Sequence, residues 1–199
     1  MIVLGLTGSM GTGKSTTAGM FRELGVPVHD SDATVHELYR GEAVGPVGEA
    51  FPGAINDGVV DRKALAAELA ARPDGFRELE SVIHPLVRRK EEAFLSKQRA
   101  AGAPLVVLDI PLLFETGADR RVDKVLVVTC EPELQRRRVF ERPGMTEEKF
   151  SMLMARQMPD AQKRERADFV VRTDNGLADA REQVKLVIDI LKRETDADA

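Results

Sequence analysis

Short apolar runs rich in β-branched residues recur along the chain, separated by longer stretches with helical spacing. The runs predict buried strands at residues 2–6, 26–29, 105–108, 124–128 and 168–172. Because they are apolar at nearly every position rather than at alternate ones, they are typical of a parallel sheet covered on both faces. The alternation of strands and helices therefore predicts an α/β fold with a five-stranded parallel sheet flanked by helices.

Helical spacing is clearest in four stretches between and after these strands. They predict helices at residues 14–24, 133–141, 147–166 and 177–192. Gly25 directly follows the first stretch, where a glycine commonly ends a helix.

One connection is too long for a simple crossover between parallel strands. Residues 33–103 separate the second and third strands and are mostly helical in pattern, with Pro85 expected to start a new helix or bend an existing one. An insertion of this length in a sheet enzyme is well placed to hold a second substrate. We expect a single domain over residues 1–199 that carries this helical substrate-binding insertion.

The segment "GLTGSMGTGKST", residues 5–16, lies between the first strand and the first helix. It fits the pattern Gly-x-x-x-x-Gly-Lys-[Ser/Thr], in which backbone N–H groups and a helix N-terminus bind phosphates. In that pattern Lys14 reaches the β- and γ-phosphates and the Ser15 hydroxyl coordinates Mg²⁺. The predicted nucleotide-binding residues are Gly8, Gly11, Thr12, Gly13, Lys14, Ser15 and Thr16. A glycine-rich turn without a ligand is the weaker alternative, since a strand precedes the segment and a helix follows it.

Two acidic residues follow the second strand in "HDSD". In open α/β sheets ligands bind beyond the carboxyl ends of the strands, which places Asp30 and Asp32 at the reactive edge. One of them could accept the proton of an attacking hydroxyl or hold Mg²⁺ through water. The alternative is that Asp32 or Ser31 caps the helix that begins near Ala33.

The third strand ends at Asp109 after a run of apolar residues, an arrangement similar to a Walker B strand. We expect Asp109 to face the metal ion together with Ser15, with Glu115 lying further out. The chain has neither the Asp-x-x-Gly switch nor the Asn-Lys-x-Asp motif that reads guanine, so a GTPase is disfavoured.

Four arginines, Arg136, Arg137, Arg138 and Arg142, crowd the helix after the fourth strand. Arg138 and Arg142 are four residues apart and share a helix face, so they could close over ATP as a lid around residues 135–160. Arg136 and Arg137 could instead form a solvated basic face. Nucleic-acid binding by this patch is a weaker option, because no aromatic residues are interleaved.

Composition narrows the class of protein further. A net charge of −4 argues against a general nucleic-acid binder. The single cysteine, Cys130, excludes an internal disulfide and indicates a reducing compartment, where we expect it to be a packing residue. No apolar run approaches the ~20 residues that span a bilayer, so we expect a cytoplasmic protein without membrane contact.

Two histidine positions are candidates for the acceptor substrate. His36 lies one helical turn after Asp32, where it could contact substrate or simply be exposed on its helix. His84, in "HPLVRR", has Arg88 one turn further on, which makes an anion-binding pair plausible.

Taken together, these segments resemble the dephospho-coenzyme A kinase family along nearly the whole chain. The similar segments occur in the family's order: "GLTGSMGTGKST", "DSD", "DRKAL", "HPLVR", "DIPLLFE", "QRRRVFER", "ARQMP" and "ADFVV". The resemblance implies a P-loop kinase that uses ATP to phosphorylate the ribose 3′-hydroxyl of dephospho-CoA, the last step of coenzyme A synthesis. Ser9 departs from the usual glycine of the loop, which raises a question about the backbone there.

The same resemblance implies roles for individual residues. Asp32 is the general base, Lys14 and Ser15 serve the phosphates and Mg²⁺, and Arg138 and Arg142 act from the lid. The acceptor-side residues that follow are Asp32, His84, Arg88, Pro111, Leu112, Leu113 and Glu115, to which we add His36.

Two alternatives to this function follow from the same residues. Small P-loop kinases that act on a nucleoside monophosphate, shikimate or gluconate share the loop and lid, but the long insertion and "HPLVR" disfavour them. A nucleotide-dependent switch without chemistry of its own would need neither the acidic pair nor the arginines.

Overall fold

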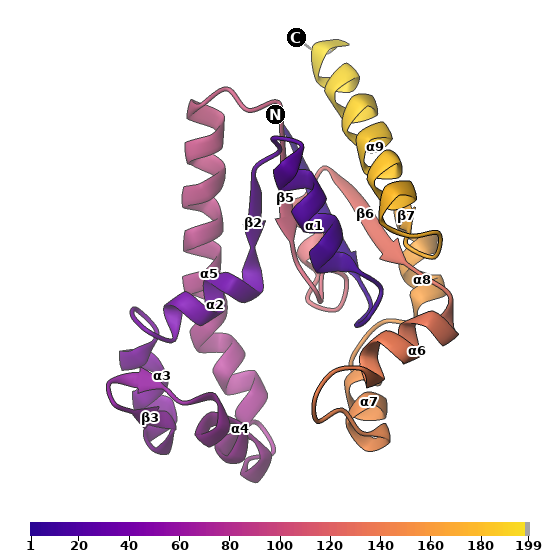
Figure 1. The fold of residues 1–199 in the computed structure, drawn as a ribbon. Helices are drawn as coiled ribbons and strands as arrows, with labels where there is room; N and C mark the ends of the chain where they lie inside the picture. The colour runs from indigo at the N-terminus through magenta and orange to yellow at the C-terminus, as the bar shows by residue number, and fades with distance from the viewer. Residues whose placement is uncertain (198–199) are drawn as a thin grey trace. The chain divides into compact units, whose positions relative to one another are not determined.

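The structure is a computed structural model that describes residues 1–197. These residues form two compact units (Figure 1). Unit 1 comprises Met1–His29 and the chain from Gln98 onward, and unit 2 comprises Asp30–Lys97. The long connection of the sequence, residues 33–103, supplies most of unit 2.

Unit 1 is built on a five-stranded parallel sheet, as the sequence predicts. Its strands are β1 (Ile2–Gly8), β2 (Val28–Asp30), β5 (Leu105–Asp109), β6 (Lys124–Thr129) and β7 (Phe169–Arg172). Their order in the sheet is β2-β5-β1-β6-β7. In the parallel register Leu6 lies opposite both Asp109 of β5 and Leu126 of β6.

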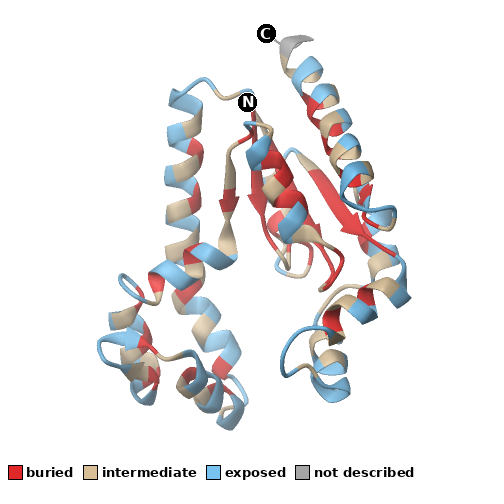
Figure 2. Ribbon diagram, viewed as in Figure 1, coloured by how far each residue is buried: buried red, intermediate tan, exposed pale blue. Residues whose placement is uncertain are grey.

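Both faces of this sheet are covered, which explains why the strands are apolar at nearly every position. Helices α1 (Lys14–Glu23) and α9 (Leu177–Ala197) contact each other and pack with Leu4, Leu6 and Leu126 on one face. Val106 and Val127, which alternate with that set, are also fully buried. Strands β1, β5 and β6 are accordingly buried along most of their length, whereas the edge strands β2 and β7 have one buried residue each (Figure 2).

The remaining helices of unit 1 differ from the sequence prediction in one place, where two short helices replace one long helix. They are η2 (Ala118–Arg121), α6 (Pro132–Phe140), α7 (Glu147–Met154) and α8 (Asp160–Glu165). The single helix expected at residues 147–166 is wrong, because the chain leaves helical geometry before Pro159 and α8 begins after it. A proline disfavours helical geometry in the residue before it and is accepted at a helix start.

Unit 2 is mainly helical. Its elements are α2 (Ser31–Leu38), α3 (Val44–Ala50), η1 (Pro52–Ala54), the antiparallel pair β3 (Ile55–Asn56) and β4 (Val59–Val60), α4 (Arg62–Ala71) and most of α5 (Gly75–Ala100). Phe51 is fully buried at the centre of its core with Leu38, Val47 and Ile83. The Arg72 guanidinium lies 4.9 Å from the Phe51 ring centroid and covers it.

Helix α5 continues through Pro85, so the alternative in which Pro85 starts a new helix is wrong. Proline lacks the N–H that would bond the carbonyl of Ser81, four residues earlier. Both residues are exposed, which lets water satisfy that carbonyl. Among residues 1–197, no helix has the length and apolar character needed to cross a membrane.

We predict that Leu126→Ala lowers the free energy of unfolding by about 2–5 kcal/mol, because Leu126 is fully buried on the interior strand β6. Urea denaturation followed by circular dichroism measures the change. Leu186→Ala is the matched control, since Leu186 is 61% exposed on α9, and we expect a change within about 0.5 kcal/mol. Equal losses in the two variants would contradict this placement of the core.

Candidate functional site

The glycine-rich loop joins β1 to α1 and leaves the first amides of α1 without a side-chain cap. Gly13 has a left-handed backbone (φ 99°), and a Cβ at Gly8 would lie only 2.6 Å from the Val128 carbonyl oxygen. Both positions therefore require glycine. An uncapped helix N-terminus preceded by such a loop is an anion-binding site.

Two glutamines hold the loop at Met10. The Gln135 amide donates a hydrogen bond to the Met10 carbonyl oxygen (2.7 Å), and the Met10 N–H donates to Gln157 Oε1 (3.1 Å). Ser9, which departs from the family pattern, is buried without a positive φ, because Asp57 is the one non-glycine residue of the described chain in that region. The serine therefore fits the loop without backbone strain.

Lys14 and Asp109, which the sequence assigned separately to phosphate and metal, form an ion pair. Lys14 Nζ lies 2.5 Å from Asp109 Oδ1, and the Asp109 side chain is only 2% exposed. Asp109 is the last residue of β5, and Lys14 begins α1, which follows β1 through the glycine-rich loop. Because β1 and β5 are neighbours in the parallel sheet, their carboxyl ends bring the two side chains together. Asp109 thereby orients the lysine at the start of the phosphate-binding helix.

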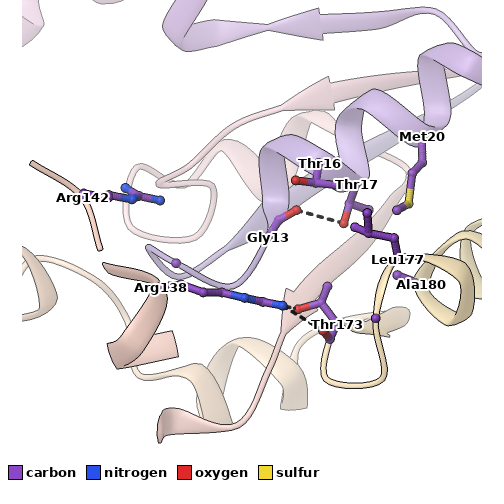
Figure 3. Close-up of a pocket in the computed structure, with 11 residues that line it drawn as sticks. Gly13, Thr16, Thr17, Met20, Arg138, Arg142, Thr173, Leu177 and Ala180 are labelled. Atoms are coloured by element: carbon purple, nitrogen blue, oxygen red, sulfur yellow. Dashed lines mark hydrogen bonds between the residues drawn. The ribbon is translucent and has the colours of Figure 1, made fainter. Parts of the chain in front are cut away.

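A cavity of about 340 Å³ lies beside the loop, within unit 1 (Figure 3). It is lined by residues that include Gly11, Gly13, Thr16, Arg138, Arg142 and Thr173. The structure thus brings the two predicted lid arginines to the same cavity as the phosphate-binding loop. Gly176 and Leu177, at the start of α9, line it as well.

The arginines of the cluster have different surroundings. Arg138 is held by Thr173, with one guanidinium nitrogen 2.8 Å from Thr173 Oγ1 and the other 3.0 Å from its carbonyl oxygen. Arg142 is exposed, and its side chain makes no hydrogen bond or ion pair with residues 1–197. Arg138 is therefore fixed in orientation, whereas Arg142 is available to a ligand.

Arg136 is a structural residue between α6 and α7. Its guanidinium lies 4.7 Å from the Phe140 ring centroid and 5.7 Å from that of Phe150, and it forms an ion pair with Glu147. The sequence left open that Arg136 belongs to a solvated basic face. In the structure its side chain instead joins the two helices through these contacts.

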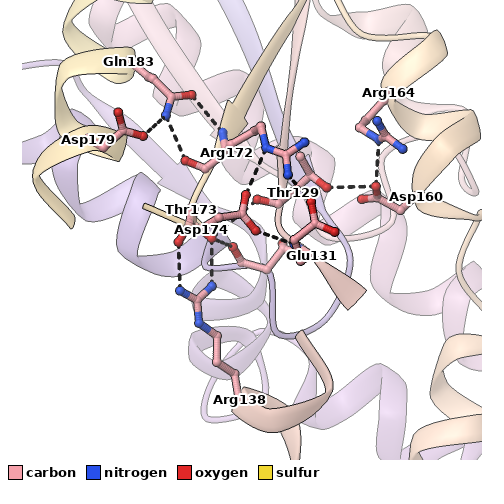
Figure 4. Close-up of polar contacts among 11 residues, drawn as sticks. Thr129, Glu131, Arg138, Asp160, Arg164, Arg172, Thr173, Asp174, Asp179 and Gln183 are labelled. Carbon is pink, nitrogen blue, oxygen red and sulfur yellow. Dashed lines mark hydrogen bonds and ion pairs between the residues drawn. The ribbon is translucent and has the colours of Figure 1, made fainter. Parts of the chain in front are cut away.

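The ends of β6 and β7 are tied by charged contacts (Figure 4). The Glu131 N–H and the Arg172 guanidinium both donate to Asp174, at 2.5 and 3.0 Å. Burial acts to raise the pKa of Asp174, but these donors outweigh it and hold the pKa below its usual value. The carboxylate therefore stays ionised beside the loop that leads to Gly176.

In unit 2 the structure separates the roles of the two acids after β2. Asp30 Oδ1 accepts a hydrogen bond from the Ala33 N–H (2.9 Å) and caps α2, so the alternative in which Asp32 or Ser31 is the cap is wrong. Asp32 lies exposed in the first turn, and its side chain makes no hydrogen bond or ion pair with the described residues. Its carboxylate is available to a substrate.

Asp32 lines a cavity of about 350 Å³ in unit 2 together with His36, Tyr39 and Arg62. A neighbouring hollow of about 570 Å³ shares the last three residues and adds Arg40 and Lys63. Their positive charge suits an anionic ligand. Burial raises the pKa of the Tyr39 hydroxyl, with Arg62 opposing, so the phenol stays protonated and can donate a hydrogen bond.

Sequence reasoning missed Tyr39, Arg62 and Thr173. Tyr39 carried a local signal, because it is the one tyrosine of the chain and follows His36 by a helical turn. Thr173 directly follows a predicted strand, where the rule for strand ends could have found it. Arg62 lies in the segment "DRKAL" that resembles the family, but the match gave it no role, because its place beside Tyr39 in the cavity depends on tertiary packing.

The other predicted acceptor-side residues are scattered. His84 is half-buried and Arg88 exposed on α5, and Pro111 and Leu112 are half-buried after β5. Leu113 is fully buried. Glu115 Oε1 lies 2.9 Å from Lys163 Nζ and accepts the Met158 N–H at 2.7 Å. Leu113 and Glu115 therefore contribute to the structural framework, and their part in binding the acceptor stays a prediction.

Comparisons with known proteins agree on one family. A sequence model of dephospho-CoA kinase matches residues 2–179. The dephospho-CoA kinase of Rhizobium meliloti is 57% identical over 192 residues, which are 96% of this chain and 99% of that protein.

Two solved structures have the same fold. Thermus thermophilus TT1252 is 38% identical with a TM-score of 0.84, covering 96% of this chain and 97% of that one. The dephospho-CoA kinase from Campylobacter jejuni is 25% identical with a TM-score of 0.73, covering 96% and 98%.

We predict that Cys130 reacts slowly with iodoacetamide in the folded protein. Burial raises the pKa of its thiol, so the reactive thiolate is scarce at neutral pH and the alkylation rate rises only at a pH above that of an ordinary cysteine. Mass spectrometry of samples alkylated from pH 7 to 10 measures the profile, with the urea-unfolded protein as the control. Equal rates for folded and unfolded protein at pH 8 would contradict the prediction.

Proposed function

The chain belongs to the dephospho-CoA kinase family, and from this premise we propose that it transfers the γ-phosphoryl group of ATP to the ribose 3′-hydroxyl of dephospho-CoA, giving CoA and ADP. On the donor side, the proposal rests on one observation: loop residues Gly11 and Gly13 line the same cavity as Arg138 and Arg142. Phosphoryl transfer needs little covalent chemistry from the protein but requires positioning and positive charge around the phosphates.

The donor site is proposed to bind ATP through the loop from Gly8 to Thr16. Amides of the loop and of the first turn of α1 bind phosphate oxygens, and the Lys14 ammonium compensates the negative charge on the β- and γ-phosphates. The Ser15 hydroxyl and the Asp109 carboxylate are oxygen donors of the kind that Mg²⁺ accepts. Mg²⁺, when bound there, neutralises charge on the two terminal phosphates.

The acceptor is proposed to bind unit 2. Asp32 accepts the proton of the 3′-hydroxyl as the oxygen attacks the γ-phosphorus, and the bond from that phosphorus to ADP breaks. His36, Tyr39 and Arg62 line the same cavity and supply contacts to the acceptor. His84 and Arg88 remain proposed anion contacts, and Pro111 and Leu112 proposed apolar contacts, for other parts of dephospho-CoA.

The segment around residues 135–160 is proposed to act as a lid. Arg138 is already fixed beside the loop, whereas Arg142 lies next to Pro143–Gly144 and its side chain has no partner among residues 1–197. Movement of Arg142 onto the transferring phosphoryl group compensates its charge and helps to exclude water. We place the reaction in the cytoplasm, and the single buried cysteine fits a reducing compartment.

We predict that the purified protein with ATP and Mg²⁺ releases ADP rapidly with dephospho-CoA and negligibly with AMP or shikimate. A coupled assay of ADP release measures the rates, and mass spectrometry identifies CoA as the product. Faster turnover of AMP or shikimate would overturn the assignment of the acceptor.

We predict that Asp32→Asn lowers kcat by about 10²–10⁴-fold, because the amide cannot accept the proton of the hydroxyl. ATP binding, measured by calorimetry, should stay within about twofold of the wild-type value, since the loss is confined to the proton-transfer step.

Asp30→Asn is the matched control for this variant. It removes the same charge two residues away and keeps the helix cap, because asparagine caps as well as aspartate. We expect it to retain most of the wild-type kcat. Equal losses in the two variants would show that the charge of the pair matters, and would remove Asp32 as the base.

A further inference from the structure

We propose that Thr173 is a positioning residue for the phosphates of the nucleotide. Its hydroxyl and carbonyl hold the Arg138 guanidinium, and the same hydroxyl fixes the peptide between Thr12 and Gly13 in the phosphate-binding loop. This inference rests on the proposed function in one respect, namely that the loop binds a nucleotide. Thr173 belongs to none of the motifs found in the sequence, and it does not itself react.

The contact with Arg138 fixes the direction of a positive charge. One guanidinium nitrogen donates to Thr173 Oγ1 at 2.8 Å and the other donates to the Thr173 carbonyl oxygen at 3.0 Å (Figure 4). A guanidinium has five N–H donors in a rigid plane, so two bonds to one residue set its orientation and leave the others for a ligand. Arg138 and Thr173 both line the 340 Å³ cavity.

The contact with the loop fixes the direction of an amide. Thr173 Oγ1 donates its hydrogen to the Thr12 carbonyl oxygen at 2.7 Å. The peptide from Thr12 to Gly13 is trans and planar, so its N–H points away from its carbonyl. With the carbonyl held by Thr173, the Gly13 N–H is directed to the opposite side of the peptide.

Packing around Gly13 supports the same assignment. A Cβ at Gly13 would lie 3.2 Å from Thr173 Cγ2 and 3.4 Å from its Oγ1, so the threonine side chain packs directly against the glycine. Thr173 itself is 8% exposed, and its N–H donates to the Thr129 carbonyl oxygen at 3.0 Å. The threonine is therefore anchored to the sheet while it contacts the loop and Arg138.

The hydroxyl has one proton, and the geometry accounts for it. It donates to Thr12 and accepts from Arg138, whereas the Thr129 carbonyl oxygen is a distant alternative acceptor at 3.5 Å. Serine preserves both functions, and valine preserves the β-branched shape but neither function. The pair of variants therefore separates hydrogen bonding from packing.

The test compares Thr173→Val with Thr173→Ser by calorimetric binding of ADP and AMP and by steady-state kinetics. We expect Thr173→Val to bind ADP about tenfold more weakly and to raise KM for ATP by a similar factor, because two bonds that preorganise the phosphate site are lost. AMP binding and KM for dephospho-CoA should change less than about twofold, and Thr173→Ser should stay near wild type.

Thr195→Val is the matched control, because it removes a threonine hydroxyl that, among the described residues, bonds only the backbone carbonyls of Leu191 and Pro104. If Thr173→Val does not fold, as judged by circular dichroism, Thr173→Ala removes the hydroxyl without pressing a methyl group against its polar partners. The comparison with Thr173→Ser then proceeds in the same way.

A double-mutant cycle tests the link to Arg138. Because Thr173 acts in part through Arg138, we expect the losses in ADP affinity from Thr173→Val and Arg138→Lys to be clearly less than additive. Wild-type ADP affinity in Thr173→Val, equal weakening in Thr173→Ser, or full additivity would each overturn the proposal. ADP binding does not depend on the acceptor, so failure to turn over dephospho-CoA would count against the proposed function alone.

Discussion

Parallel pairing of β1 with both β5 and β6 is the constraint on which the rest of unit 1 depends. It sets the ends of these strands at one edge, so that the glycine loop after β1 meets Asp109 at the end of β5 and Val128 near the end of β6. The ion pair between Lys14 and Asp109 and the close approach at Gly8 both follow from this register. Burial of both faces stabilises the pairing, because separating the strands would expose apolar side chains on both sides of the sheet to water.

The loop is held from outside as much as by its own glycines. Gln135, Gln157 and Thr173 reach it from α6, from the segment before α8 and from the end of β7. Each bonds a backbone group of Met10 or Thr12, so the cradle has its shape before a nucleotide arrives. Preorganised amides and a fixed Arg138 cost no reorganisation at the moment of transfer, which is when such groups contribute most. The Arg142 side chain, in contrast, is not held by any described residue and is free to contact a bound ligand.

The sequence was sufficient for features that depend on neighbouring residues, and insufficient for those that depend on packing. The five strands and the phosphate-binding loop follow from local patterns, and their boundaries shift by only a few positions. The break before Pro159 was missed because helical spacing on both sides masked the proline. The sequence offered Asp32 or Ser31 as the cap of α2, and only the backbone geometry shows that the helix begins earlier and that Asp30 caps it. The positions of Arg62 and Thr173 carried some signal, but their roles depend on contacts with residues far along the chain, which the sequence did not show.

The buried pair of Lys163 and Glu115 illustrates a contribution other than stability. Lys163 has no exposed surface, and its Nζ is 2.9 Å from Glu115 Oε1 but lacks the alignment of a hydrogen bond. Desolvation of two charges offsets most of their attraction, so the pair adds little to the free energy of folding. Removing one partner would nevertheless leave the other charge buried without a counter-charge. The same penalty applies to any arrangement of α8 that separates Lys163 from Glu115, so the pair favours the observed arrangement. Because Glu115 also accepts the Met158 N–H, next to Gln157, the same pair fixes the residue that bonds the loop at Met10. The ion pair thus contributes specificity of arrangement, and through it the shape of the phosphate site.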